Sequence, residues 1–260
     1  LASLAASQGF KISGGAAGDA AGNSVSDAGD VNGDGFADLL VGEGMDVYSL
    51  SFGGVSYVVF GKASGWDASI DLANLDGTDG FRVVRGQDQS IWSVSTAGDV
   101  NGDGLDDILI GAPFHNPDGT LNTGASYVIY GKTGGWDPTF ELSSIVDATN
   151  GFRLDGQDGD QVGRTVSSAG DVNGDGFSDL LVGADGAGHS GTDAGSSYIV
   201  FGGNFTGAVT HLGTTGNDTL NGTSTAEIGL TPEEVAGQIK QGVYLTPAEV
   251  ASAEWLGSDG

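Results

Sequence analysis

Three copies of the heptapeptide GDVNGDG carry the side chains of this sequence that are best suited to chemistry. They occupy Gly29–Gly35, Gly98–Gly104 and Gly170–Gly176. In each copy, oxygen-bearing side chains stand at positions one, three, five and nine of a loop, and position seven would add a backbone carbonyl. Calcium binds about six to eight such oxygens. The spacing therefore predicts one calcium ion per loop, about three in all. The expected ligands are Asp30, Asn32, Asp34, Phe36, Asp38, Asp99, Asn101, Asp103, Leu105, Asp107, Asp171, Asn173, Asp175, Phe177 and Asp179.

The loops resemble the start of an EF-hand but not its end. Glycine at the sixth position permits a sharp turn around an ion. An EF-hand then needs a bidentate glutamate at position twelve, where this chain has Val41, Ile110 and Val182. The apolar runs after the loops are typical of buried strands, so we expect each loop to lie between two strands. The alternative is a hairpin turn without metal, which three copies with the same offsets disfavour.

Other segments recur with the loops at a spacing of about 70 residues, which indicates tandem structural units. Each unit carries four short strand candidates, and the last of them is nearly all apolar, as in Tyr57-Val58-Val59-Phe60. A strand buried on both faces between neighbouring blades would have this composition. The candidates in the second unit are Phe81–Val84, Ser93–Ala97, Asp107–Ile110 and Ala125–Tyr130.

This pattern predicts an all-β fold of β-propeller-type blades, because propeller blades are four-stranded and repeat in tandem. The blades are expected at about 9–61, 80–131 and 151–202, within a region that ends near residue 205. Propellers usually close with about 4–8 blades, and three would leave the ring incomplete. We therefore expect self-association or additional blades from other chains, with a two-chain six-blade ring as one possibility.

Three motifs resemble the FG-GAP repeats of the integrin α-subunit propeller and of its bacterial relatives. They are AGDVNGDGFSDLLVG, GSSYIVFG and LDGTDGFR, and the resemblance covers roughly residues 1–205. It implies that the Asp-rich hairpin loops bind calcium. The bacterial relatives are often large secreted proteins without cysteine, and this chain has no cysteine. The resemblance thus implies a secreted, extracellular or cell-surface protein, bacterial in origin.

The charge balance limits the possible partners. The chain has 35 acidic and 8 basic residues, with a net charge of -27. Nucleic acid is excluded as a partner because its phosphates would be repelled. No apolar stretch reaches the roughly 18 residues that a membrane-spanning helix needs, so membrane insertion is not expected.

The last third of the chain has a different pattern. Residues 206–225 include a single turn that resembles the RTX nonapeptide calcium repeat, with Asp218 and Leu220 at its Asp and apolar positions. A polar turn without metal is the alternative. Residues 226–260 form a tail in which two Thr-Pro-x-Glu segments predict two short helices.

Nothing in the sequence points to catalysis, so we do not expect an enzyme. No nucleophile elbow stands in a strand-turn-helix context. His115 and His189 lie in corresponding loops and are interpreted as solvated, although two such residues could bind a transition metal.

The favoured function is a calcium-stabilised extracellular adhesion or interaction module that binds a protein or glycan through its blade loops. The alternatives are a self-assembling subunit of a surface layer or filament, and an accessory domain of a secreted hydrolase. The ligand-binding loops would be Gly44–Gly54, Pro113–Thr123 and Asp185–Ala194.

Overall fold

A computed structural model describes the chain at residues 8–16, 18–44, 54–84, 91–116, 122–145, 149–157, 159–188 and 194–203. Strands make up nearly all the regular structure of these ranges. Two short 3₁₀ turns accompany them, η1 (Leu72–Asn74) and η2 (Leu142–Ser144). The expected RTX-like turn and the helical tail lie outside the described residues.

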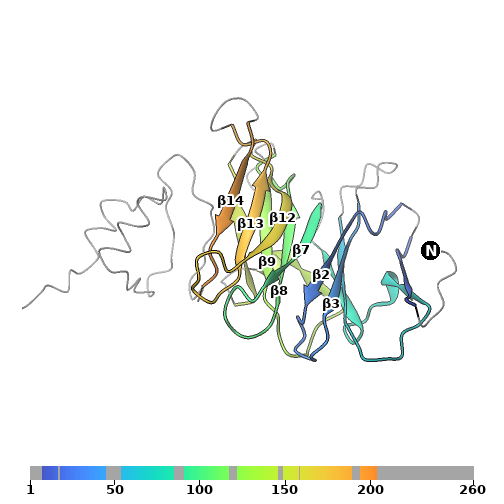
Figure 1. The fold of residues 1–260 in the computed structure, drawn as a ribbon. Helices are drawn as coiled ribbons and strands as arrows, with labels where there is room; N and C mark the ends of the chain where they lie inside the picture. Colours follow the sequence, from blue (N-terminus) through green and yellow to red (C-terminus); the bar gives the residue numbers. More distant parts are fainter. Residues whose placement is uncertain are drawn as a thin grey trace, which may run out of the picture.

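The strands form three blades that follow one another along the chain (Figure 1). Blade 1 consists of β2 (Ser24–Gly29), β3 (Asp38–Gly42), β4 (Ser56–Val59) and β6 (Gly80–Val84). Blade 2 consists of β7 (Ser93–Gly98), β8 (Asp107–Ala112), β9 (Ala125–Ile129) and β11 (Gly151–Asp155). Blade 3 consists of β12 (Val162–Gly170), β13 (Asp179–Ala184) and β14 (Ser196–Val200). The predicted all-β, propeller-type architecture with an incomplete ring is confirmed.

Within each blade the strands are antiparallel, and the fourth strand comes from the start of the next repeat. β6 pairs with β4 of blade 1, with Gly80 opposite Val59, and β11 pairs with β9 in the same way. The units at 9–61, 80–131 and 151–202 are therefore offset from the sheets by one strand. The sequence pattern locates strands but does not record which neighbour each one joins.

Short parallel strands join the outer edges of successive blades. β10 (Thr139–Glu141) lies between the third and fourth strands of blade 2 in the chain and pairs with β6 of blade 1. β5 (Ser69–Asp71) follows β4 and pairs with β1 (Lys11–Ser13). In both blades, the linker between the third and fourth strands thus pairs with the strand that precedes the first strand of the blade.

The core lies between the blades. Leu40 and Val58 of blade 1 belong to one buried cluster with Ile108 and Ile110 of blade 2, and a second cluster joins blades 2 and 3. β4 and β9 are buried along their whole length, as the apolar runs predict. Blades 1 and 3 cover β9, whereas β4 is covered by blade 2 on one face and by a cluster that includes Leu72, Ile12 of β1 and Ile70 of β5 on the other. Of the innermost strands, β7 contacts both β2 and β12. The backbone amide of Val94 in β7 donates to the Ser24 hydroxyl in β2 at 3.2 Å.

Candidate metal centre

Each Asp-rich loop lies between two strands, as expected, and these are the first and second strands of its blade. In blade 1 the loop starts at Asp30, directly after β2, and ends at Asp38, the first residue of β3. Gly33 and Gly35 have φ values of 74° and 88°, which an L side chain rarely adopts. The two glycines let the chain reverse its direction within this nine-residue loop.

The first aspartate of each loop faces inward and organises the turn. In loop 1, Oδ1 of Asp30 accepts from the amides of Gly33 at 2.9 Å and Asp34 at 3.1 Å, and Oδ2 accepts from Gly35 at 2.9 Å. Asp99 and Asp171 make the same three bonds in their own loops. Backbone donors thus fix the carboxylate at the centre of each turn.

The third and fifth positions continue the pattern. Asn32 Oδ1 accepts from the Asp34 amide at 2.8 Å, and Asp34 Oδ1 accepts from the Phe36 amide at 2.9 Å. Asn32 Nδ2 also donates to Asp34 Oδ2 at 3.1 Å. Loops 2 and 3 repeat all three bonds.

The ninth-position aspartate holds the loop to the body of the blade. Asp38 is fully buried, and its carboxylate accepts from the amides of Val31 at 3.1 Å and Gly61 at 2.7 Å. Gly61 follows the end of β4, so this side chain links the start of the loop to the third strand. Asp107 and Asp179 make equivalent bonds.

Burial of Asp38 and of Asp107 changes the protonation of these two carboxylates. It raises the pKa of Asp38 to about 6, and repulsion from Asp34 and Asp30 adds to the effect while the two amide bonds oppose it. Asp107 is raised further, to about 8, by burial and then by Asp103 and Asp99. A nearby cation would favour the ionised carboxylates.

The donor set of each loop fits calcium in kind and order, since it consists of three carboxylates, one amide oxygen and one backbone carbonyl. The positions of these side chains fit calcium less well than their chemical types do. Within the described ranges, no group of three or more His, Asp or Glu side chains is placed so that it could hold a metal ion. A cation would thus require the amide and carbonyl oxygens as well as carboxylates drawn closer together.

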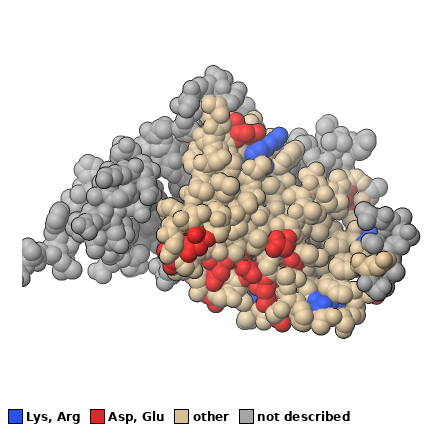
Figure 2. All heavy atoms as spheres, in the orientation of Figure 1, with Lys and Arg blue, Asp and Glu red and all other residues tan. Residues whose placement is uncertain are grey.

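Successive loops are bonded to one another. The Asp106 amide in loop 2 donates to the Asp30 carbonyl at 3.2 Å, and the Ser178 amide in loop 3 donates to the Asp99 carbonyl at 2.9 Å. Asp106 also accepts from the Asp30 amide at 2.8 Å. Acidic side chains gather on the side of the molecule where the loops project (Figure 2). The three candidate sites thus form one connected acidic rim.

Two buried polar groups were missed by the sequence analysis. Tyr57 donates to Glu43 Oε1 at 2.8 Å, and burial raises the pKa of Glu43 to about 7. His115 was interpreted as solvated, but it is 4% exposed and its Nε2 lies 3.7 Å from Oδ1 of buried Asp155. The blade body covers this loop, which a lone histidine in the sequence does not reveal. His189 lies outside the described residues, so a metal site that joins the two histidines stays a prediction.

The repeat pattern has a direct counterpart among known proteins. The FG-GAP repeat family matches residues 22–59, 90–129 and 162–200. Three segments of the chain thus match the FG-GAP repeat. Each matched segment contains the first three strands of one blade and the whole Asp-rich loop between the first two.

Integrins are among the proteins that are similar to this chain. Integrin alpha-4 of Xenopus laevis is 30% identical over 157 residues, which is 60% of this chain and 14% of the relative. Integrin alpha-PS5 of Drosophila melanogaster is 31% identical over 160 residues, 61% of this chain and 14% of the relative. Phosphatidylinositol-glycan-specific phospholipase D of Bos taurus is 35% identical over 115 residues, 43% of this chain and 13% of the relative. The chain thus spans a small part of each of these relatives.

No helix within the described residues has the length and apolar character to cross a membrane.

Proposed function

We propose that this chain is a non-catalytic, calcium-stabilised interaction module that acts outside the cell. Its FG-GAP repeats and its similarity to integrin α-chains support a role in binding a protein or glycan ligand. The ligand would contact the loops that join blade strands, because such loops are presented by a rigid scaffold. A secreted or cell-surface location, in a bacterium, is part of this proposal.

The three Asp-rich loops would hold the calcium. In loop 2, Asp99, Asn101, Asp103 and Asp107 would supply side-chain oxygens, and Leu105 would supply its carbonyl. The observation that carries this proposal is the fully buried Asp107, whose pKa is raised first by burial and then by the nearby carboxylates of Asp103 and Asp99. Such a group is stable as an anion only next to a compensating charge.

Calcium would neutralise clustered negative charge and fix the hairpins, so that binding stabilises the folded state. Extracellular modules bind calcium at about 10⁻⁴–10⁻³ M. A chain with this affinity would be most stable in an extracellular medium. The hydrogen bonds between loops would spread the stabilisation across the blades.

Thermal unfolding with calcium and with chelator tests the proposal. We expect a higher unfolding temperature in calcium and a stoichiometry of about three ions. The Asp103→Asn variant keeps the acceptor for the Leu105 amide but removes a charge from loop 2, so it should lose one ion. Asp76→Asn is the matched control, since Asp76 caps a similar turn at Thr78 outside the loops. Unchanged unfolding temperatures in chelator would refute the role of calcium.

Two alternatives remain open to test. The similarity to the phospholipase D relative favours an accessory domain of a secreted hydrolase, for which a screen against phosphodiesters, esters and glycosides is the readout. The incomplete ring favours a subunit that self-assembles into a surface layer or filament. For both alternatives we propose that the open blades associate with further blades. The particle size in solution distinguishes such an assembly from a monomeric module.

A further inference from the structure

The two ends of the row of blades are apolar. Among the described residues, the exposed large hydrophobic side chains all belong to the first and the last blade. Val25 (66%) and Phe36 (42%) belong to blade 1, whose outer face starts the row. The others belong to blade 3, whose outer face ends it: Val172 (55%), Leu181 (38%), Ile199 (46%) and Phe201 (37%).

Each exposed side chain of blade 3 has a buried counterpart in the other blades. Leu181 corresponds to Leu109 in blade 2, which is 0% exposed because blade 3 covers it. The remaining counterparts in blade 2 are Val100, Val128 and Tyr130, and those in blade 1 are Val31, Leu40, Val58 and Phe60. The outer face of blade 3 therefore has the composition of a blade interface.

The strands of the two ends are complementary as well. Blade 1 together with β10 forms a five-stranded sheet in the order β10-β6-β4-β3-β2. The ends contain a two-stranded sheet, β1-β5, and the three-stranded blade 3, β12-β13-β14. β1 corresponds to β6, and β5 corresponds to β10. Joined at β1 and β14, the two sheets would reproduce the order of the complete five-stranded sheet.

We propose that β1 of one copy pairs antiparallel with β14 of a second copy and completes its blade 3. This inference rests on the self-association proposed above and adds its location and register. The pairing of β11 with β9 sets that register, because Gly151 lies opposite Ile129 and Asp155 opposite Ala125. The corresponding partners are Gly9 with Val200 and Ser13 with Ser196.

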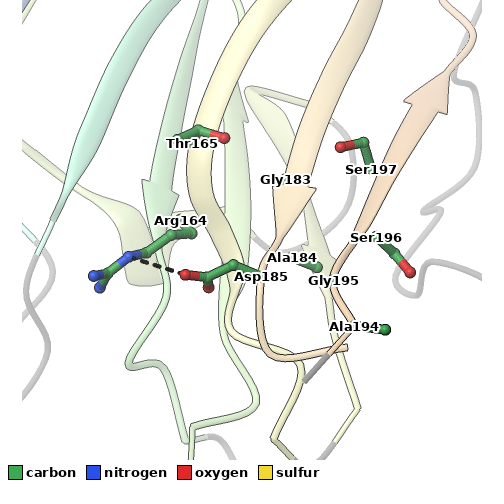
Figure 3. A pocket seen from close by; sticks show the side chains of 9 residues that line it. All are labelled: Arg164, Thr165, Gly183, Ala184, Asp185, Ala194, Gly195, Ser196 and Ser197. Carbon is green, nitrogen blue, oxygen red and sulfur yellow. Dashed lines mark ion pairs between the residues drawn. The ribbon is translucent and has the colours of Figure 1, made fainter. Parts of the chain in front are cut away.

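A pocket of about 640 Å³ marks where the second copy would insert (Figure 3). Thr165 and Gly183 line it and correspond to Ser24 and Gly42 of blade 1. In blade 1 the same place receives Val94: its amide donates to the Ser24 hydroxyl, and its side chain lies beside Gly42. Val25 corresponds to Val94, so the exposed Val25 of the second copy fits the pocket.

The loop contacts between blades would extend across the new interface. Inside one chain, the Asp99 and Val100 carbonyls accept from the amides of Ser178 and Gly203. At the junction, the Asp171 and Val172 carbonyls of one copy would accept from the second copy's amides at positions 37 and 62. These bonds would align the loops of both copies along one rim.

The chain presents both halves of this interface, so a second copy is the occupant that matches each end. In Figure 1 the N-terminal segment and β14 lie at opposite ends of the described structure, and three blades are too few to close on themselves. Two copies that pair reciprocally give a six-blade ring with two-fold symmetry, within the usual range of about 4–8 blades. The high negative charge opposes association, so calcium in the loops would favour it.

Disulfide trapping tests the register, because the chain has no cysteine of its own. Chains with Ser13→Cys and chains with Ser196→Cys, distinguished by mass, are mixed in calcium and oxidised. We expect a mixed disulfide dimer. Ser13→Cys mixed with Ser167→Cys is the matched control, since Ser167 lies on β12, two strands beyond β14 and about 14 Å from β1 in the proposed sheet. That separation is too long for a disulfide.

Light scattering of the unmodified chain in calcium accompanies the trapping. We expect a dimer, and Ile199→Lys should shift it to monomer with an unchanged circular dichroism spectrum, because Ile199 is already exposed in one chain. Larger particles without the 13–196 bridge would overturn the strand pairing and leave self-association standing. A monomer would overturn both the strand pairing and self-association, whatever covers the end face of blade 3. It would leave the calcium proposal unaffected.

Discussion

Asp106 in loop 2 and Asp30 in loop 1 exchange two hydrogen bonds across the boundary between blades. The Asp106 amide donates to the Asp30 carbonyl at 3.2 Å, and the Asp106 carboxylate accepts from the Asp30 amide at 2.8 Å. Asp30 in turn organises loop 1 through its own carboxylate. The order of one loop therefore depends on the blade that follows it.

The Asp106→Ala variant should lose about 1–2 kcal/mol of unfolding free energy, because the Asp30 amide loses a charged acceptor while the bond to the Asp30 carbonyl remains. Urea unfolding in saturating calcium measures the change. Ser178→Ala at the corresponding position of loop 3 is the control and should change stability by less. Equal losses in both variants would contradict the role of the Asp106 carboxylate.

The Gly104→Ala variant should destabilise the chain by about 1–2 kcal/mol, because Gly104 has a φ of 88° that an alanine adopts only with strain. No atom lies within 4 Å of the added methyl group, so crowding does not contribute. Gly203→Ala has the same open surroundings without a positive φ and should be nearly neutral. Thermal unfolding of the two variants separates backbone strain from loss of space, and an unaffected Gly104→Ala protein would rule out the strained turn.

The Trp136→Ala variant should cost about 3 kcal/mol or more, because Trp136 is 7% exposed and stacks on Phe81 with ring centroids 4.2 Å apart. Lys132 also lies over its ring at 4.6 Å. Trp66 makes the corresponding stack on Phe10 but is less buried, so Trp66→Ala should cost less. Chemical denaturation measures both, and the reverse order of the two losses would contradict the assigned packing.

Glu43→Gln should stabilise the chain at alkaline pH. Burial raises the pKa of Glu43 from 4.5 to about 7, so the folded state holds its proton more tightly than the unfolded state. The stability that this group contributes is fully present below pH 4.5 and is lost as the pH rises through 7. The variant should therefore match the parent chain near pH 4.5 and exceed it by up to about 3 kcal/mol at pH 8. Urea unfolding across this range in calcium measures the difference, and a constant difference would exclude Glu43 as its source.

The sequence was sufficient for the elements with strong local patterns. The strands beside the loops were predicted to within two residues, since runs such as Ile108-Leu109-Ile110 can be buried only in a strand between blades. The turn glycines were recognised because they recur at fixed offsets. Both signals are local and repeat three times.

The features that the sequence did not predict depend on distant partners. β6 joins the blade before its own repeat, and the three-residue strand β10 pairs with it across a linker. Neither pairing leaves a periodic pattern in the sequence. The Glu43–Tyr57 pair has no counterpart in the other blades, where Ala112 and Ala184 occupy the position of Glu43. A contact that occurs once gives no repeat signal.

A crystal structure of the chain grown in millimolar calcium is the most direct test of the central claim, that calcium stabilises the Asp-rich loops. The account predicts a density peak in each loop with about six to eight oxygen ligands at about 2.3–2.6 Å, including Asp103, Asp107 and the Leu105 carbonyl in loop 2. Loops that contain only water at that calcium concentration, with their carboxylates turned apart, would contradict it.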